Sequence, residues 1–167
     1  AEIEKFFPNM TSVQYAGTHR TRLLSDLNDF DVVLVTYQTL ANDLHRLSEI
    51  DWNIIAADEG HKMCNGRTDA ARAFEAIVGR QKVILTGTAM QNRPDELYSL
   101  MNLTVPGLLY DRAWFRERFV HGLGLGGATA LGQEATRKMR LLGAYTSPFY
   151  LIRTNAEVKN ELPRVNM

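Results

Sequence analysis

The sequence predicts an α/β domain in which a parallel β-sheet is flanked by helices. Two observations lead to this prediction. The first is a set of near-continuous apolar runs, typical of strands covered on both faces by helices; they span residues 31–37, 53–58 and 82–86, with a weaker candidate strand at 12–16. The second is the alternation of these runs with helix-like stretches at about 38–49, 68–79 and 94–103. Alternating strand and helix patterns are the signature of a layered α/β domain.

The pattern changes after Pro106, where helices replace the alternation. Residues 111–120 predict an amphipathic helix with Asp111 near its N-terminus, where a carboxylate interacts favourably with the helix dipole. A second helix is expected at about 131–145. The glycine-rich stretch at 122–127 has a spacing similar to a dinucleotide-binding fingerprint, but no strand precedes it and no acidic residue follows suitably, which favours a loop.

Composition narrows the possible classes of protein. The 167 residues include 45% hydrophobic and 23% charged residues, with 19 basic and 19 acidic side chains. The zero net charge argues against a self-sufficient nucleic-acid binder, although a domain that supplies part of a DNA-binding surface stays possible. The single cysteine, Cys64, cannot form an intramolecular disulfide. No apolar run approaches the roughly 18 residues that span a bilayer, and the first residues do not resemble a secretion signal. With no initiating Met, both ends are expected to be cuts in a longer polypeptide.

Two adjacent carboxylates, Asp58 and Glu59, stand at the end of the run at 53–58, and His61 comes just after them. The carboxyl ends of parallel strands are where ligands bind in open sheets. Asp58 has the chemistry to hold a hydrated Mg²⁺, and Glu59 has the chemistry to activate a water for attack on a γ-phosphate. The alternative is a solvated strand end that happens to be acidic.

A second group of small and polar residues lies at the end of the run at 82–86. Its sequence is Leu-Thr-Gly-Thr-Ala-Met-Gln-Asn at 85–92. Hydroxyl groups around a glycine can hydrogen-bond a carboxylate or a phosphate-bound water without blocking close approach. Taken alone, this segment is also explained as a strand-to-helix turn with Asn92 or Thr88 as a helix cap.

Together, Asp-Glu-Gly-His at 58–61 and Leu-Thr-Gly-Thr-x-x-Gln-Asn at 85–92 resemble motifs II (a DEAH-type box) and III of superfamily-two helicases, in their Swi/Snf-like branch. Three other segments resemble that branch in the same order: 33–40 (Val-Leu-Val-Thr-Tyr-Gln-Thr-Leu), 94–102, and 149–163, which ends in Glu-Leu-Pro. Gly60 and residues 105–109 are similar to the Cockayne-syndrome-B-like repair translocases.

The resemblance implies a partial RecA-like ATP-binding lobe at 1–110, a helical protrusion at 111–150 and a closing segment at 151–167. It implies ATP and Mg²⁺ as cofactors and double-stranded DNA, contacted through its backbone, as partner. The remodelled substrate would be a nucleosome, a stalled polymerase or another DNA-bound protein, and a eukaryotic member would be nuclear. The implied roles are catalytic for Asp58, Glu59, His61 and Gln91, nucleotide-binding for Asp58, Glu59, Thr86, Gly87 and Thr88, and DNA-contacting for Thr36 and Tyr37.

The chain also departs from the family pattern. Ile152 and Asn155 stand where basic residues are usual, and Ala89 replaces the usual proline of motif III. The 167 residues contain no Gly-x-x-x-x-Gly-Lys-Thr/Ser phosphate loop, so the isolated chain is expected to be inactive. The missing phosphate loop and the altered Ile152 and Asn155 favour an alternative, a catalytically inert interaction or regulatory module. The intact Asp58, Glu59, His61 and Gln91 favour a motor.

Overall fold

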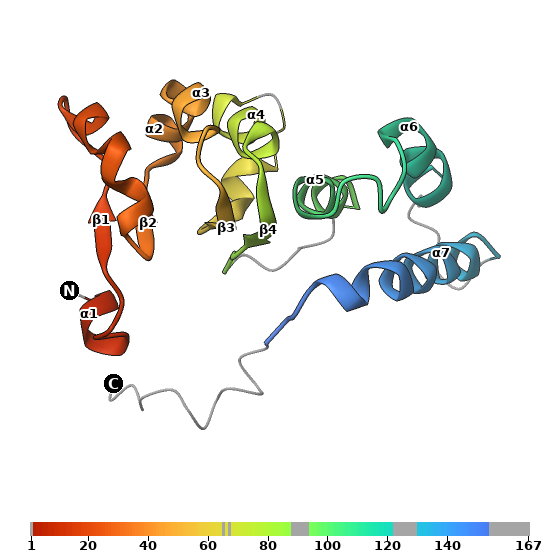
Figure 1. Cartoon of the computed structure of the whole chain (residues 1–167). Helices are drawn as coiled ribbons and strands as arrows, with labels where there is room; N and C mark the ends of the chain where they lie inside the picture. The colour runs from red at the N-terminus through yellow and green to blue at the C-terminus, as the bar shows by residue number, and fades with distance from the viewer. Residues whose placement is uncertain (1, 65, 67, 88–93, 122–129, 154–167) are drawn as a thin grey trace, which may run out of the picture. The chain divides into compact units, whose positions relative to one another are not determined.

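The computed structural model describes residues 2–64, 66, 68–87, 94–121 and 130–153 (Figure 1). The chain divides into two compact units. Unit 1 comprises Ala1–Thr88 and Ser99–Leu108, and unit 2 comprises Ala89–Tyr98 and Leu109–Met167. Helix α5 (Pro94–Thr104), at the position predicted for 94–103, contributes to both. The predicted boundaries at 110 and 150 stay a prediction, and most of the closing segment lies outside the described residues.

Unit 1 contains two pairs of parallel strands. In the first pair, β1 (Ser12–Gln14) lies beside β2 (Val32–Leu34), in a register that joins Val13 to Val33. In the second, β3 (Trp52–Ala57) lies beside β4 (Gly79–Ile84), in a register that joins Ala57 to Ile84. The structure therefore confirms a mixed α/β fold with parallel strands, including the weak strand at 12–16.

The apolar runs at 31–37, 53–58 and 82–86 predict three neighbouring parallel strands, and this prediction is wrong for the first two. Among the described residues β2 pairs with β1, and β3 pairs with β4. Side chains from both β2 and β3, including Val33 and Ile55, line an apolar cleft of about 110 Å³. Apolar runs predict that a strand is buried on both faces, but they do not encode its order in the sheet, which explains the error.

The helical segments of unit 1 are short. The helix expected at 38–49 is interrupted at Asp43, and the helix expected at 68–79 ends at Ala76. The segments are α1 (Glu2–Phe6), η1 (Arg20–Asp29), α2 (Tyr37–Asn42), α3 (Leu44–Leu47), η2 (Gly60–Met63) and α4 (Asp69–Ala76). Thr36 and Thr68 cap α2 and α4 by accepting hydrogen bonds from the N–H groups of Thr39 and Ala71. The sequence analysis did not predict the ten-residue 3₁₀ segment η1, whose Leu27 is buried.

Apolar side chains from these elements form one core. Its most deeply buried large members are Tyr15, Leu27, Leu47, Met63 and Phe74. On the second strand pair, Lys82 of β4 donates from Nζ to the carbonyl oxygens of Phe74 and Glu75, both at 2.8 Å. These contacts satisfy C-terminal carbonyls of α4 and fix that helix against β4, because a cation is favourable at a helix C-terminus.

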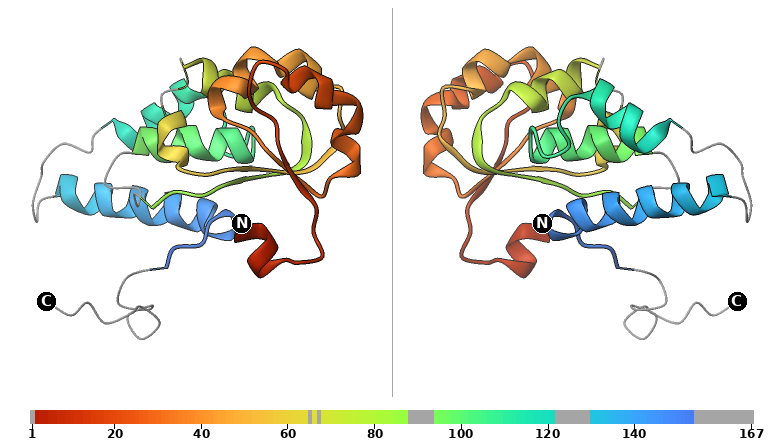
Figure 2. Two further views of the ribbon diagram at one scale, coloured as in Figure 1. Left: turned by 90° about the vertical axis from the view of Figure 1, so that its left-hand side faces the viewer. Right: turned by 90° about the vertical axis from the view of Figure 1, so that its right-hand side faces the viewer.

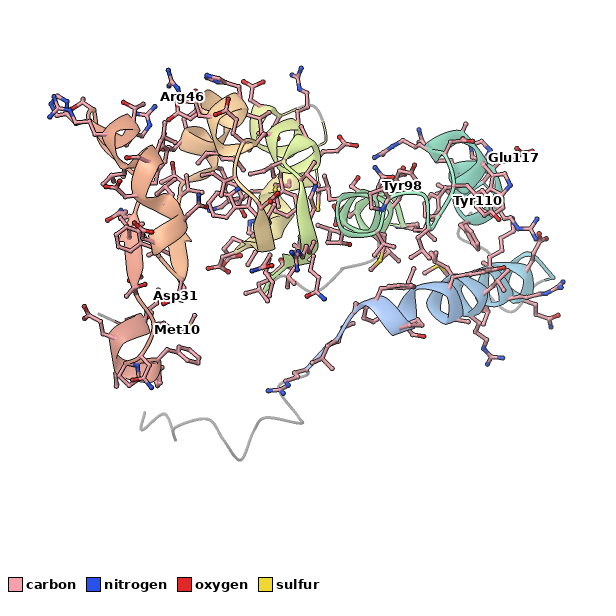
Figure 3. The ribbon with its side chains drawn as sticks, in the orientation of Figure 1. Met10, Asp31, Arg46, Tyr98, Tyr110 and Glu117 are labelled. Carbon is pink, nitrogen blue, oxygen red and sulfur yellow. The ribbon has the colours of Figure 1, made fainter. Side chains whose placement is uncertain are left out.

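The interruption at Asp43 coincides with a buried polar cluster. The Asp43 carboxylate is 3% exposed and accepts hydrogen bonds from Tyr15 Oη at 3.0 Å and Arg20 Nε at 2.6 Å. Arg46, labelled in Figure 3, approaches the other carboxylate oxygen at 3.5 Å. The Arg20 hydrogen bond is the main cause of a lowered pKa for Asp43, against the effect of burial. The cluster joins β1, η1 and the α2–α3 junction, and its hydrogen bonds compensate the burial of a charge.

All regular elements in the described part of unit 2 are helices. It contains α6 (Arg112–Phe115), the π-helical segment η3 (Arg116–Val120), α7 (Ala130–Thr146), which is continuous in both views of Figure 2, and the 3₁₀ segment η4 (Ser147–Phe149). The predicted cap is confirmed, since Asp111 Oδ1 accepts from the N–H of Trp114 at 2.9 Å. The helix expected at 111–120 begins as predicted but widens to π geometry after Phe115.

Aromatic rings form the core of unit 2. Phe115 and Phe119 are fully buried, with ring centroids 5.4 Å apart, and Tyr98 lies 4.9 Å from Phe115. Tyr98 also donates from its hydroxyl to the carbonyl oxygen of Tyr110 at 3.1 Å, and Figure 3 labels both residues. The glycine-rich stretch at 122–127 lies outside the described residues. No helix in the described part of the chain is long and apolar enough to cross a membrane.

The buried cluster predicts a strong effect of Asp43→Asn on stability. The amide keeps a similar shape but loses the charge that Arg20 and Arg46 face, so the free energy of unfolding should fall by about 1–3 kcal/mol. Urea denaturation of the chain measures this. The matched control is Asp69→Asn, which removes an ion pair to Arg72 in which the carboxylate is 80% exposed. That change should cost less than about 1 kcal/mol; equal losses for the two variants would contradict the assigned role of Asp43.

The same carboxylate sets a pH dependence. Because the folded-state pKa of Asp43 is lowered, its stabilisation is complete above the ordinary Asp pKa of about 3.9 and is lost as pH falls through the lowered value. Unfolding measured from pH 6 downwards should therefore show Asp43→Asn and the unchanged chain converging in stability at acid pH.

Candidate functional site

The candidate site is the turn that follows β3. Ala57 is the last residue of the strand, and the exposed carboxylates of Asp58 and Glu59 come directly after it. Asp58 Oδ1 accepts a hydrogen bond from the N–H of Glu59 at 2.9 Å. Glu59 has φ 54° and ψ 47°, the left-handed conformation that a residue with a Cβ adopts at an energetic cost. The conformation places two carboxylates side by side at the carboxyl end of a parallel strand pair.

The end of β4 holds this turn through the backbone. The N–H of Leu85 donates to the carbonyl oxygen of Ala57, and the N–H of Gly60 donates to the carbonyl oxygen of Leu85, both at 2.8 Å. Gly60 is required here by space, because a Cβ at this position would lie 2.0 Å from Cγ2 of Ile84. The backbone hydrogen-bond ladder between β3 and β4 thus continues one step beyond the strands and fixes the backbone of the turn.

His61 contacts the second carboxylate. Its Nδ1 lies 3.1 Å from Oε2 of Glu59, and both side chains are about half exposed. An imidazole at this distance restricts the rotamer of the carboxylate. The structure therefore brings His61 into contact with Glu59, next to Asp58, and the roles of the three residues stay a prediction.

Tyr37 joins the group from another element. It is the first residue of α2, and its hydroxyl donates a hydrogen bond to the carbonyl oxygen of Asp58. Burial raises the pKa of the Tyr37 hydroxyl, and the charges of Asp58 and Glu59 raise it further, so the group stays protonated and acts as a donor. The sequence suggested Tyr37 as a DNA contact, and its hydrogen bond to motif II was missed.

The segment after β4 is described as far as Gly87. Thr86 is partly buried, and a Cβ added at Gly87 would meet no heavy atom of the described residues within 4 Å, so the space there is open with respect to them. That opening suits the close approach of a ligand. Thr88 and Gln91 lie outside the described residues, so their implied roles stay predictions.

The donor set fits a hydrated divalent cation better than a tightly bound one. Asp58 and Glu59 supply exposed carboxylate oxygens, which Mg²⁺ prefers. The described residues contain no group of three or more His, Cys, Asp or Glu side chains that could hold a metal ion. Magnesium characteristically keeps several waters and takes phosphate oxygens as ligands, so two adjacent carboxylates suit a metal that arrives with a nucleotide.

Comparison with known proteins identifies the family. The sequence profile of the SNF2-related domain matches residues 1–167. This chain belongs to the SNF2-related domain family. Its relatives include the TATA-binding protein-associated factor MOT1 of Saccharomyces cerevisiae, 33% identical over 97% of the chain, and the nuclear protein STH1/NPS1 of the same yeast, 32% identical over 97%. The DNA excision repair protein ERCC-6-like 2 of mouse is 32% identical over 80% of the chain.

A solved structure gives the same result. The Sulfolobus solfataricus SWI2/SNF2 ATPase core in complex with dsDNA matches with a TM-score of 0.78 and 31% identity, over 97% of this chain and 32% of that one. The SNF2-related chain spans 9% of MOT1, 13% of STH1/NPS1 and 9% of ERCC-6-like 2. The predicted family and the RecA-like fold are therefore confirmed. The assignment to the Cockayne-syndrome-B-like branch stays a prediction, because MOT1, STH1/NPS1 and ERCC-6-like 2 are similar to the chain at nearly the same identity.

The contact between Gly60 and Ile84 predicts a specific coupling in this SNF2-related domain. Gly60→Ala should lower the free energy of unfolding by about 1–3 kcal/mol, because the new methyl group overlaps the stiff, β-branched side chain of Ile84. In an Ile84→Ala background the same change should cost about 1 kcal/mol less, which a double-mutant cycle of urea denaturation measures. Gly87→Ala, where the space is open, is the matched control. Additive losses would show that the two positions do not touch.

Proposed function

We propose that the complete protein carrying this chain is an ATP-driven translocase on double-stranded DNA, in which Asp58 and Glu59 serve Mg-ATP hydrolysis. The observation that carries the proposal is the pair of exposed carboxylates at the shared carboxyl edge of β3 and β4, in a domain of the SNF2-related family. The dsDNA-bound Sulfolobus ATPase core supports the choice of partner.

Each residue then has a distinct task. Asp58 would hold Mg²⁺ through water, and the metal would neutralise charge on the β- and γ-phosphates. Glu59 would orient the attacking water and accept its proton as a general base. His61, 3.1 Å from the Glu59 carboxylate, would keep that side chain in the orientation needed for this step. Only the charged form of Glu59 can accept the proton.

The remaining predicted residues would link nucleotide state to DNA. Thr86, Gly87, Thr88 and Gln91 would couple the bound nucleotide to DNA grip. Thr36 is the candidate for contact with the phosphate backbone, a sequence-independent kind of binding. Its hydroxyl already caps α2 at 3.1 Å from the N–H of Thr39, so a phosphate would meet it at the start of a helix. We place a eukaryotic protein of this kind in the nucleus, as the name of STH1/NPS1 suggests.

The hydrolytic assignment predicts opposite signatures for the two carboxylates in the complete protein. Glu59→Gln keeps the shape of the side chain but removes the base, so DNA-stimulated turnover should fall by about 10²- to 10⁴-fold while nucleotide affinity survives. Asp58→Asn should weaken Mg²⁺-dependent nucleotide binding as well as turnover. Steady-state hydrolysis and equilibrium binding of a fluorescent ATP analogue measure both effects.

Glu134→Gln on α7 is the control for this pair, since it removes an exposed carboxylate that contacts Lys138 in unit 2. It should leave turnover unchanged. A Glu59→Gln rate within about twofold of the unchanged protein would remove Glu59 from the mechanism. The inert-module alternative predicts no hydrolysis in the unchanged complete protein.

The isolated 167-residue chain should hydrolyse no ATP above background, with or without DNA. Its sequence contains no Gly-x-x-x-x-Gly-Lys-Thr/Ser loop. The chain therefore lacks the backbone N–H groups and the lysine with which such a loop binds the triphosphate. Phosphate release measured in parallel for the chain and the complete protein tests this. DNA-stimulated turnover by the chain alone would contradict the claim that hydrolysis needs a phosphate loop that this sequence does not contain.

A further inference from the structure

Tyr37 makes a long-range contact at the candidate site. It begins α2 directly after the Thr36 cap, and 21 residues separate it from Asp58, whose carbonyl oxygen accepts its hydroxyl proton. The contact joins the junction between β2 and α2 to the turn after β3. Among the described residues β2 and β3 are not paired, so no strand ladder makes this connection.

The acceptor atom belongs to the peptide group between Asp58 and Glu59. A peptide group is planar, so the Asp58 carbonyl and the Glu59 N–H point in opposite directions from one rigid plate. Tyr37 holds the oxygen of this plate, and Asp58 Oδ1 holds its N–H at 2.9 Å. The orientation of the plate fixes where both carboxylate side chains leave the backbone.

This plate needs support because Glu59 is left-handed, at φ 54°. A non-glycine residue keeps such a conformation only where its surroundings over-determine it. Gly60 supplies one anchor through its N–H bond to the carbonyl oxygen of Leu85, and the Tyr37 hydroxyl supplies another. Loss of the Tyr37 hydroxyl would leave the plate free to rotate towards a relaxed conformation.

The donor itself is firmly placed. Thr36 Oγ1 accepts from the Thr39 N–H at 3.1 Å and also lies 2.9 Å from Thr39 Oγ1, which fixes the first turn of α2. Leu40, one turn along, is buried in the core, and the Tyr37 ring packs against the same core. A movement of the α2 N-terminus is therefore transmitted to the Tyr37 hydroxyl rather than absorbed by a flexible side chain.

We propose that Tyr37 is a positioning residue for the Asp58–Glu59 pair, and that its hydrogen bond to the Asp58 carbonyl transmits the position of the α2 N-terminus to these carboxylates. The inference rests on the proposed hydrolytic function. It assigns Tyr37 to the hydrolysis site, through backbone geometry, instead of to the DNA backbone. Thr36 is the adjacent residue, so DNA contact there would act on hydrolysis through this bond.

The test compares two tyrosine-to-phenylalanine changes in the complete protein. Tyr37→Phe removes the hydroxyl that reaches Asp58, and Tyr98→Phe removes a hydroxyl that donates to the Tyr110 carbonyl in unit 2. Both variants lose the same type of tyrosine–carbonyl hydrogen bond and keep the ring. The readouts are kcat at saturating DNA, KM for ATP, Kd for double-stranded DNA, and hydrogen exchange of a peptide covering residues 58–63.

Tyr37→Phe should lower kcat about 3- to 10-fold, the size expected for one net hydrogen bond, with little change in KM or in Kd for DNA. Exchange in the 58–63 peptide should accelerate by a similar factor. Tyr98→Phe should change neither quantity. Weaker DNA binding by Tyr37→Phe with an unchanged kcat would overturn the proposal in favour of a DNA contact. Equal kcat and equal exchange rates in the two variants would mean that the Tyr37 hydroxyl has only a structural role, and this would also overturn the proposal.

Hydrogen exchange separates this inference from the proposed function. If the unchanged protein hydrolyses no ATP, the proposed function fails, and the 58–63 peptide alone then decides the positioning role. Faster exchange only in Tyr37→Phe would retain the link between α2 and the carboxylate turn, and unchanged exchange would overturn it.

Discussion

The backbone ladder between β3 and β4 is the constraint on which the candidate site depends. It runs from the start of both strands to Leu85, whose N–H and C=O bind Ala57 and Gly60 respectively. Because the strands are parallel, they finish at the same edge, and the last rungs determine where the following turn begins. The start of the acidic turn is thus fixed by hydrogen bonds between backbone groups alone.

Two local features give that turn its shape. Gly60 allows the backbone to pass Ile84 where any side chain would collide, and Glu59 accepts a left-handed conformation. The first feature is a matter of packing, and the second stores strain that neighbouring hydrogen bonds must balance. Functional turns commonly combine such strain with external anchors, and here the anchors come from β4 and α2.

The buried Asp43 cluster holds β1, η1 and the α2–α3 junction together through hydrogen bonds. The β3–β4 ladder has the same role at the candidate site. Arg20 and Tyr15 hold the carboxylate in a region that would otherwise exclude a charge. It also interrupts the helix that apolar spacing predicts across 38–49. The two halves of that stretch, α2 and α3, then point their buried residues Leu40 and Leu47 into one core.

The sequence by itself determined the type of fold and the location of the acidic site, because both depend on local pattern. The sequence is enough to predict apolar runs of strand length, carboxylates at strand ends and the capping Asp111. The order of the strands, the cluster around Asp43, the collision that requires Gly60 and the bond from Tyr37 to Asp58 were decided by tertiary structure. Each joins residues far apart in the chain, and a single sequence records which residues are present but not which of them meet.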